Sequence, residues 1–186
     1  MGTAAERSER SEMAAWLRTA LEGGLEAGFI GGVALLLVRL LAFTEFALLV
    51  AWVTPSPHSM LRRLARSAIW IAVKWPAYPF VGERSLDTGF DAVVVGAGLA
   101  THFLCAMSWG VLFGLSAARR SKNMTVALGL LWGVLGGLAE GFGFARMIGG
   151  GFVLNPAITL VYLMYGYVLA RSLLRFERKT GLRHDA

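Results

Sequence analysis

The sequence predicts an all-helical membrane protein, with four transmembrane helices in a glycine-packed bundle and one amphipathic interfacial helix. Three observations lead to this fold class. Hydrophobic residues make up 56% of the 186 residues and charged residues only 16%, whereas soluble domains average about 25% charged residues. Several apolar stretches reach the roughly 20 residues that a helix needs to cross the hydrocarbon core. Glycine, with 23 residues, is more frequent in membrane helices than in soluble ones.

Residues 1–20 form a polar segment with both signs of charge, followed by a predicted transmembrane domain over residues 21–174. The polar segment lacks the basic region that leads directly into an apolar stretch in a signal peptide. The first span covers about residues 25–53 and carries Arg39 and Glu45. It is longer than one span needs, so it either tilts or ends in an interfacial segment. Glu22 and Glu26 suit the positive end of the helix dipole at the start of this span.

The connection after the first span holds a predicted amphipathic helix at about residues 59–75. Pro55 and Pro57 end the first helix, because proline lacks an amide donor and restricts the residue before it. The apolar residues that then share one helical face are Leu61, Leu64, Ala65, Ala68, Ile69 and Ala72, with Arg62, Arg63 and Arg66 elsewhere. Trp70 and Trp75 near the end suit a helix in the plane of the membrane interface. A fifth span is the competing interpretation, but its apolar part is too short.

The remaining spans cover about residues 92–118, 124–145 and 152–174, and a basic tail of residues 175–186 follows. With four spans, both termini and the second loop share one side of the membrane. That side carries eleven lysines and arginines and the other side six. The positive-inside rule therefore predicts that both termini are cytoplasmic in a bacterial inner membrane. We expect the basic C-terminal segment to lie against anionic headgroups or to dock on a partner.

The string DAVVVGAGLATHF, residues 91–103, begins like a dinucleotide-binding strand and its phosphate loop. Gly96 and Gly98 fit that pattern, but the third small position is Thr101 and no acidic residue follows about twenty residues later. The run from Val93 to Ala118 is apolar and uncharged. We therefore expect a membrane helix here. The net charge of +6 is assigned to basic loops that flank membrane helices, and no nucleic acid is expected as a partner.

Glycines recur every four residues in three of the spans. Membrane helices associate through close packing at small residues, because lipid is as apolar as their side chains. The spaced glycines are Gly24, Gly28 and Gly32 in the first span, Gly110 and Gly114 in the second, and Gly129, Gly133, Gly137 and Gly141 in the third. They predict a compact bundle. A glycine-lined pore or substrate path is the alternative.

Four segments resemble the YagU-like family of small bacterial membrane proteins of unknown function. They are GGLEAGFIGGVALLL in the first span, GAGLATHFLCAMSWGVLFGL in the second, VALGLLWGVLGGLAEG in the third, and MIGGGFVLNPAITLVYLMYGYVLA before and within the fourth. The resemblance covers roughly residues 23–42 and 96–170 and implies a four-span architecture without an established activity. It also implies a second histidine in the fourth helix, where this chain has Tyr162. That tyrosine counts against a paired-histidine metal or haem site.

Two spans show parallel series of residues. His102, Ala106, Gly110 and Gly114 in the second span match Tyr162, Gly166 and Ala170 in the fourth. The match hints at a weak internal repeat.

Charged residues inside a bilayer are rare and usually face the protein interior. At about 1.5 Å per helical residue, Arg39, His102 and Glu140 fall at similar heights in the outer half of the membrane. We therefore predict a buried polar cluster in which Arg39 keeps Glu140 ionised, His102 hydrogen-bonds to Glu140, and Tyr162 is within reach. The cluster is either a structural pin between helices or a proton or ligand site.

Catalysis and cofactor binding have little support in the sequence. His102 is a candidate haem ligand, but no second histidine lies in any span, so we expect no cofactor and no metal site. Cys105 lies one turn from His102, and apolar surroundings make such a thiol inert. The only cysteine also excludes an internal disulfide.

These observations predict a non-catalytic accessory or assembly subunit of a larger membrane complex, such as one of electron transport. Its expected partners are the lipid bilayer and either other membrane subunits or further copies of itself. A small oligomeric transporter or channel that uses the polar cluster is the first alternative. A haem-binding membrane protein, with His102 as a ligand, is the second.

Overall fold

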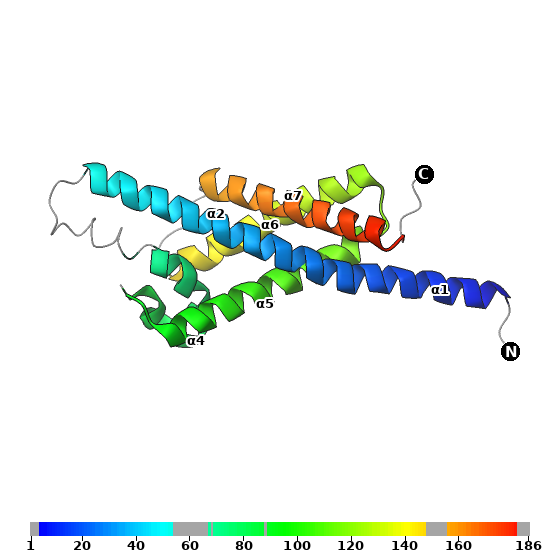
Figure 1. The fold of residues 1–186 in the computed structure, drawn as a ribbon, viewed down its shortest axis with the longest axis horizontal. Helices are drawn as coiled ribbons and strands as arrows, with labels where there is room; N and C mark the ends of the chain where they lie inside the picture. The colour runs from blue at the N-terminus through cyan, green and yellow to red at the C-terminus, as the bar shows by residue number, and fades with distance from the viewer. Residues whose placement is uncertain (1–3, 54–66, 68, 88, 148–155, 182–186) are drawn as a thin grey trace. The chain divides into compact units, whose positions relative to one another are not determined.

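The computed structural model describes residues 4–53, 67, 69–87, 89–147 and 156–181 of the chain (Figure 1). These residues are almost entirely helical, and none of them lies in a β-strand. The long helices are α1 (Ala4–Arg18), α2 (Gly24–Val53), α5 (Ala92–Ala117), α6 (Lys122–Met147) and α7 (Pro156–Lys179), and a π-helical turn, η1 (Thr19–Gly23), joins α1 to α2. The prediction of an all-helical fold is confirmed.

Within the described segments, three helices are long and apolar enough to cross a membrane: residues 6–42, 92–117 and 122–142. The length and hydropathy of these three helices are therefore those of membrane-spanning segments. The predicted fourth span begins outside the described residues, and the rest of it lies in α7. Most of the predicted interfacial helix also lies outside the described residues, although Ser67 and residues 69–74 are helical.

The Gly-x-Gly string lies in the first turns of α5, as the sequence predicts. The preceding Asp91 caps this helix, because its Oδ1 accepts hydrogen bonds from the N–H groups of Val93 at 3.1 Å and Val94 at 3.2 Å. An aspartate at this position satisfies amide donors that have no partner within the helix. No strand–loop–helix unit forms at residues 91–103.

The chain divides into two compact units. The first unit contains residues 1–32 and 106–186, and the second contains residues 33–105. In the first unit α6 and α7 pack side by side and antiparallel, with Gly129 against Gly166 and Gly133 against Tyr162. A Cβ atom on Gly129 would lie only 2.5 Å from the carbonyl oxygen of Gly166. The two backbones therefore touch at positions that have no side chain.

The first turns of α2 also pack closely against α5 within the first unit. Gly24 faces Gly110, and a Cβ atom on Gly24 would lie 2.8 Å from the Gly110 carbonyl oxygen. One turn further along, Gly28 faces Ala106, whose carbonyl oxygen would lie 2.5 Å from an added Cβ. The other side of the helix faces α7, where Gly23 meets Leu173 and Phe176.

The helix-dipole explanation for Glu22 and Glu26 is wrong. The helix begins at Ala4 and continues through η1 into α2 with helical backbone angles at the junctions, so neither glutamate lies at a free N-terminus. Both instead face basic side chains. Arg18 Nε lies 2.9 Å from Glu22 Oε2, and Lys179 Nζ lies 3.9 Å from Glu26 Oε1.

In the second unit, three short helical segments precede α5. They are η2 (Trp75–Ala77), α4 (Tyr78–Val81) and η3 (Gly82–Leu86). The fully buried Lys74 holds the following loop, because its Nζ donates to the carbonyl oxygens of Asp87 at 2.6 Å and Gly89 at 2.9 Å. Gly98 of α5 faces the backbone of Val73 and Lys74. This contact places the loop at the start of α5.

Candidate functional site

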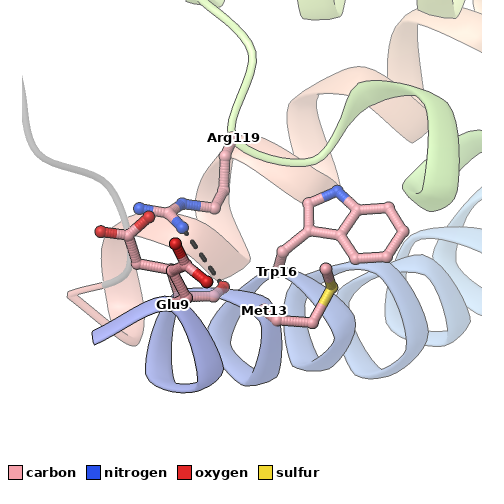
Figure 2. Close-up of a pocket in the computed structure, with 5 residues that line it drawn as sticks. Glu9, Met13, Trp16 and Arg119 are labelled. Carbon is pink, nitrogen blue, oxygen red and sulfur yellow. Dashed lines mark hydrogen bonds between the residues drawn. The ribbon is translucent and has the colours of Figure 1, made fainter. Parts of the chain in front are cut away.

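An open cleft of about 760 Å³ lies in the first unit, between α1 and the turn that joins α5 to α6 (Figure 2). Its lining residues are Glu9, Glu12, Met13, Trp16 and Arg119. Four of these five residues come from α1. Their spacing of three, four and seven positions places them on one face of that helix.

Helix α1 is exposed over most of its length. Residues 6–14 are all exposed, and Met13 keeps 57% of its surface accessible. Ala20 meets Gly114 near the end of α5 and Glu12 meets Arg119 of the α5–α6 turn, so only the start of α1 extends past that turn (Figure 1). Met13 and Leu17 therefore leave apolar surface of α1 accessible.

Arg119 lies in the α5–α6 turn and contacts α1. Arg119 has a positive φ of 61°, which is uncommon for a residue with a side chain. Its backbone N–H donates to Oε1 of the fully buried Glu177 of α7 at 2.6 Å. This hydrogen bond stabilises the conformation. Ser121 then starts α6, because its Oγ accepts the N–H of Met124 at 3.4 Å.

Figure 2 shows the Arg119 side chain reaching from this turn toward α1, beside Glu9, while Met13 and Trp16 lie further along α1. Nη1 of Arg119 donates to the backbone carbonyl of Glu12 at 3.4 Å. The cleft thus combines an arginine, two glutamates, a methionine and a tryptophan. Tryptophan, methionine and arginine are enriched at protein–protein interfaces, so this arrangement suits an amphipathic polypeptide segment.

The predicted polar cluster draws two residues from each compact unit. In the second unit, Arg39 Cζ lies 6.0 Å from the centroid of the Trp75 ring, which is the outer limit of a cation–π contact. His102 is buried and packs edge-on against Phe103, with 5.3 Å between the ring centroids. His102 as a haem ligand stays a prediction. Cys105 is exposed on α5, so protein does not enclose its thiol.

The other two cluster residues belong to the first unit. Glu140 is half-buried on α6. Tyr162 is buried on α7, where its ring lies beside Gly136 and Gly137 and its centroid is 6.1 Å from that of Tyr165. Because the four residues belong to separately described units, their meeting in one cluster stays a prediction.

The predicted glycine positions can be compared with contacts inside the first unit. The backbone or side chains of other helices lie against Gly24, Gly28, Gly110, Gly114, Gly129, Gly133 and Gly137. Gly32 is buried and Gly141 is half-buried. The two parallel series also differ in what they contact. The series in α5 faces η1 and the start of α2, through Ala106, Gly110 and Gly114. The series in α7 faces α6, through Tyr162, Gly166 and Ala170.

Sequence reasoning missed three residues that organise the two units: Glu177, Arg119 and Lys74. Residues 175–179 were assigned to a basic tail, but they continue α7, and Phe176 and Glu177 are buried there. One signal for this was available. Leu169, Leu173, Phe176 and Glu177 share a helical face, so a single acidic residue among basic ones lay on the packing side. Nothing in the local sequence indicated the role of Lys74.

Comparison with known proteins returned no match to a family model, a curated protein or a solved structure. The described residues define the class of this protein: it is helical, and three of the described helices are long and apolar enough to cross a membrane.

Proposed function

We propose that this chain is a non-catalytic accessory or assembly subunit of a larger membrane complex, and that a partner polypeptide docks on α1. The exposed helix α1 and the cleft beside it carry this proposal. Residues 6–14 are exposed, and the cleft offers Met13, Trp16 and Arg119 to a partner. Aromatic residues and arginine often supply most of the binding energy of an interface.

The proposed membrane arrangement is a glycine-packed bundle of four spans in a bacterial inner membrane, with both termini in the cytoplasm. Its fourth span is α7, which lies antiparallel to α6 with Gly166 against Gly129. The excess of lysine and arginine at the termini and the α5–α6 turn supports the orientation. The resemblance to YagU-like proteins belongs to the same proposal, since it implies four spans.

Purification from the native membrane in a gentle detergent tests the subunit proposal. We expect mass spectrometry to find a defined set of membrane proteins that co-purify with the wild-type chain. Met13→Glu should release them, because it places a charge on the apolar part of the cleft. Ser11→Glu is the matched control, since Ser11 is exposed on α1 but does not line the cleft. It adds the same charge and should retain the partners.

Two results would count against docking on α1. One is a wild-type chain that purifies only as a homo-oligomer. The other is a partner set that both variants retain equally, which would place the interface elsewhere on the molecule.

A small transporter or channel is the second candidate function, and the buried His102 favours it. Buried polar residues within membrane helices commonly line proton or substrate paths. Proton or ion flux into proteoliposomes that is lost in both His102→Ala and Glu140→Gln would support this function. Flux that neither substitution changes would rule out the predicted polar cluster as its path.

A further inference from the structure

One face of α7 remains exposed along the whole described length of the helix. Its residues follow at spacings of three or four positions: Leu160, Met164, Tyr167, Arg171, Arg175 and Arg178. Such spacing keeps all six side chains on a single helical face. The opposite face is buried by Tyr165, Leu169, Leu173 and Phe176, so the exposed face is not used for packing within the first unit.

The chemical character of this face changes in order along the helix axis. Leu160 is 69% exposed and apolar, Tyr167 is 46% exposed and amphipathic, and the three arginines follow toward the C-terminus. At about 1.5 Å per residue, Leu160 lies roughly 10 Å before Tyr167, and the arginines span roughly another 10 Å. Hydrocarbon, aromatic belt and headgroups follow each other in this order at a membrane surface.

The arginines are not explained by partners within the described part of the chain. No ion pair there involves Arg171, Arg175 or Arg178, whereas the neighbouring Lys179 lies 3.9 Å from Glu26. The helix dipole favours positive charge, but only within about the last turn of a helix. The dipole therefore explains the position of Arg178, but it does not explain why Arg171 and Arg175 lie on this face.

We infer that this basic stripe of α7, defined as Arg171, Arg175 and Arg178, binds the phosphate headgroups of anionic phospholipids. The inference rests on the proposed placement of α7 as a span with a cytoplasmic C-terminus. The guanidinium groups extend from the edge of the apolar face to the level of the headgroups, where an arginine can donate two parallel hydrogen bonds to phosphate. Lys122 adds charge at the same end, because the α6–α7 register places it opposite residues near 173.

Native mass spectrometry of the full chain in detergent, titrated with phosphatidylglycerol or phosphatidylcholine, tests this inference. The wild type should bind phosphatidylglycerol more tightly than phosphatidylcholine. Because each basic residue near an anionic surface changes affinity by about fivefold, R171Q/R175Q should weaken phosphatidylglycerol binding more than tenfold. R7Q/R10Q removes two exposed arginines from α1 and is the matched control. It should leave lipid binding unchanged.

Further measurements keep the inference testable if R171Q/R175Q fails to fold. Raising the salt concentration should weaken phosphatidylglycerol binding to the wild type without changing phosphatidylcholine binding. Equal binding of both lipids by the wild type, or equal losses in both double variants, would overturn the inference. A chain that is soluble without detergent would instead overturn the membrane placement, so the two failures are distinguishable.

Discussion

Asp91 and Glu177 both accept backbone N–H groups at helix ends, but they do so in different environments. Asp91 is partly exposed and caps the helix that follows it directly. Glu177 is fully buried and serves a turn 58 positions away in the chain. Capping by a neighbouring aspartate is a local property, whereas the role of Glu177 depends on how α7 packs.

We expect the stability of the chain to depend on pH through Asp91. The hydrogen bond from the Val94 N–H is the main cause that lowers the pKa of Asp91 below its ordinary value of 3.8, and Arg84 adds to it. A lowered folded-state pKa contributes stability that is fully present above the unfolded-state pKa. This stability is lost as the pH falls from about 4 through the lowered value. We therefore expect the melting temperature in detergent, followed by circular dichroism, to fall over that range.

Asp91→Asn isolates this effect, because asparagine caps helices as well as aspartate does but does not titrate. The variant should lose less of its melting temperature than the wild type between pH 5 and pH 2. Parallel acid profiles for the two proteins would contradict the assignment.

Glu177→Ala should destabilise the chain by about 1–3 kcal/mol, because the partly buried Arg119 N–H would lose its acceptor. Glu177→Gln keeps an acceptor oxygen and should cost less. The free energy of unfolding in a mixed-micelle titration measures both effects. The prediction fails if the alanine variant unfolds at the wild-type denaturant concentration.

The helices of the first unit show why small residues recur in this chain. Gly133 lies against the backbone of Tyr162 and Leu163, so the α6–α7 contact leaves no room for a side chain there. Gly96, in α5, has no atom of another segment within 4 Å of an added Cβ. The two positions have the same residue type but opposite environments.

Gly133→Ala should therefore destabilise the chain by about 1–3 kcal/mol, the usual cost of overpacking a tight contact. Gly96→Ala should be neutral or stabilise by up to about 1 kcal/mol, because alanine favours the helix without meeting a neighbour. Thermal unfolding in detergent compares the two variants. A loss of stability at Gly96 equal to that at Gly133 would show that helix packing is not the cause.

For the whole molecule, the arrangement of the helices predicts which segments share a side of the membrane. Arg119 contacts Glu12, so α1 and the α5–α6 turn lie at the same end of the first unit. Helix α5, with residues 92–117, is long and apolar enough for one membrane crossing, and Glu83 precedes it in the chain. From the lysine and arginine excess we predict that α1 and the turn are cytoplasmic.

Cysteine labelling checks this topology in a Cys105→Ser background. An impermeant maleimide should label Glu83→Cys in intact spheroplasts. It should label Ser11→Cys and Asn123→Cys only after lysis. The side chains at all three positions are exposed. Labelling of Glu83→Cys and Asn123→Cys from the same side would contradict a single crossing by α5.

The sequence alone was sufficient to predict the helical class and the main apolar segments. Residues 92–117 and 122–142 match the predicted spans closely, because the preference of a segment for hydrocarbon depends on which residues it contains. The cap at Asp91 is also a local feature, because the aspartate and the N–H groups that it accepts are neighbours in the chain. The predicted polar cluster of Arg39, His102, Glu140 and Tyr162 could not be resolved in this way, since it depends on how separate parts of the chain meet.

Contacts between distant residues required the tertiary structure. The hydrogen bond from the Arg119 N–H to Glu177 and the buried position of Lys74 depend on the register and rotation of packed segments. Composition assigns a segment to water or lipid, but many packing registers bury the same apolar area. Only the folded chain selects the register that brings particular side chains and backbone groups within hydrogen-bonding distance.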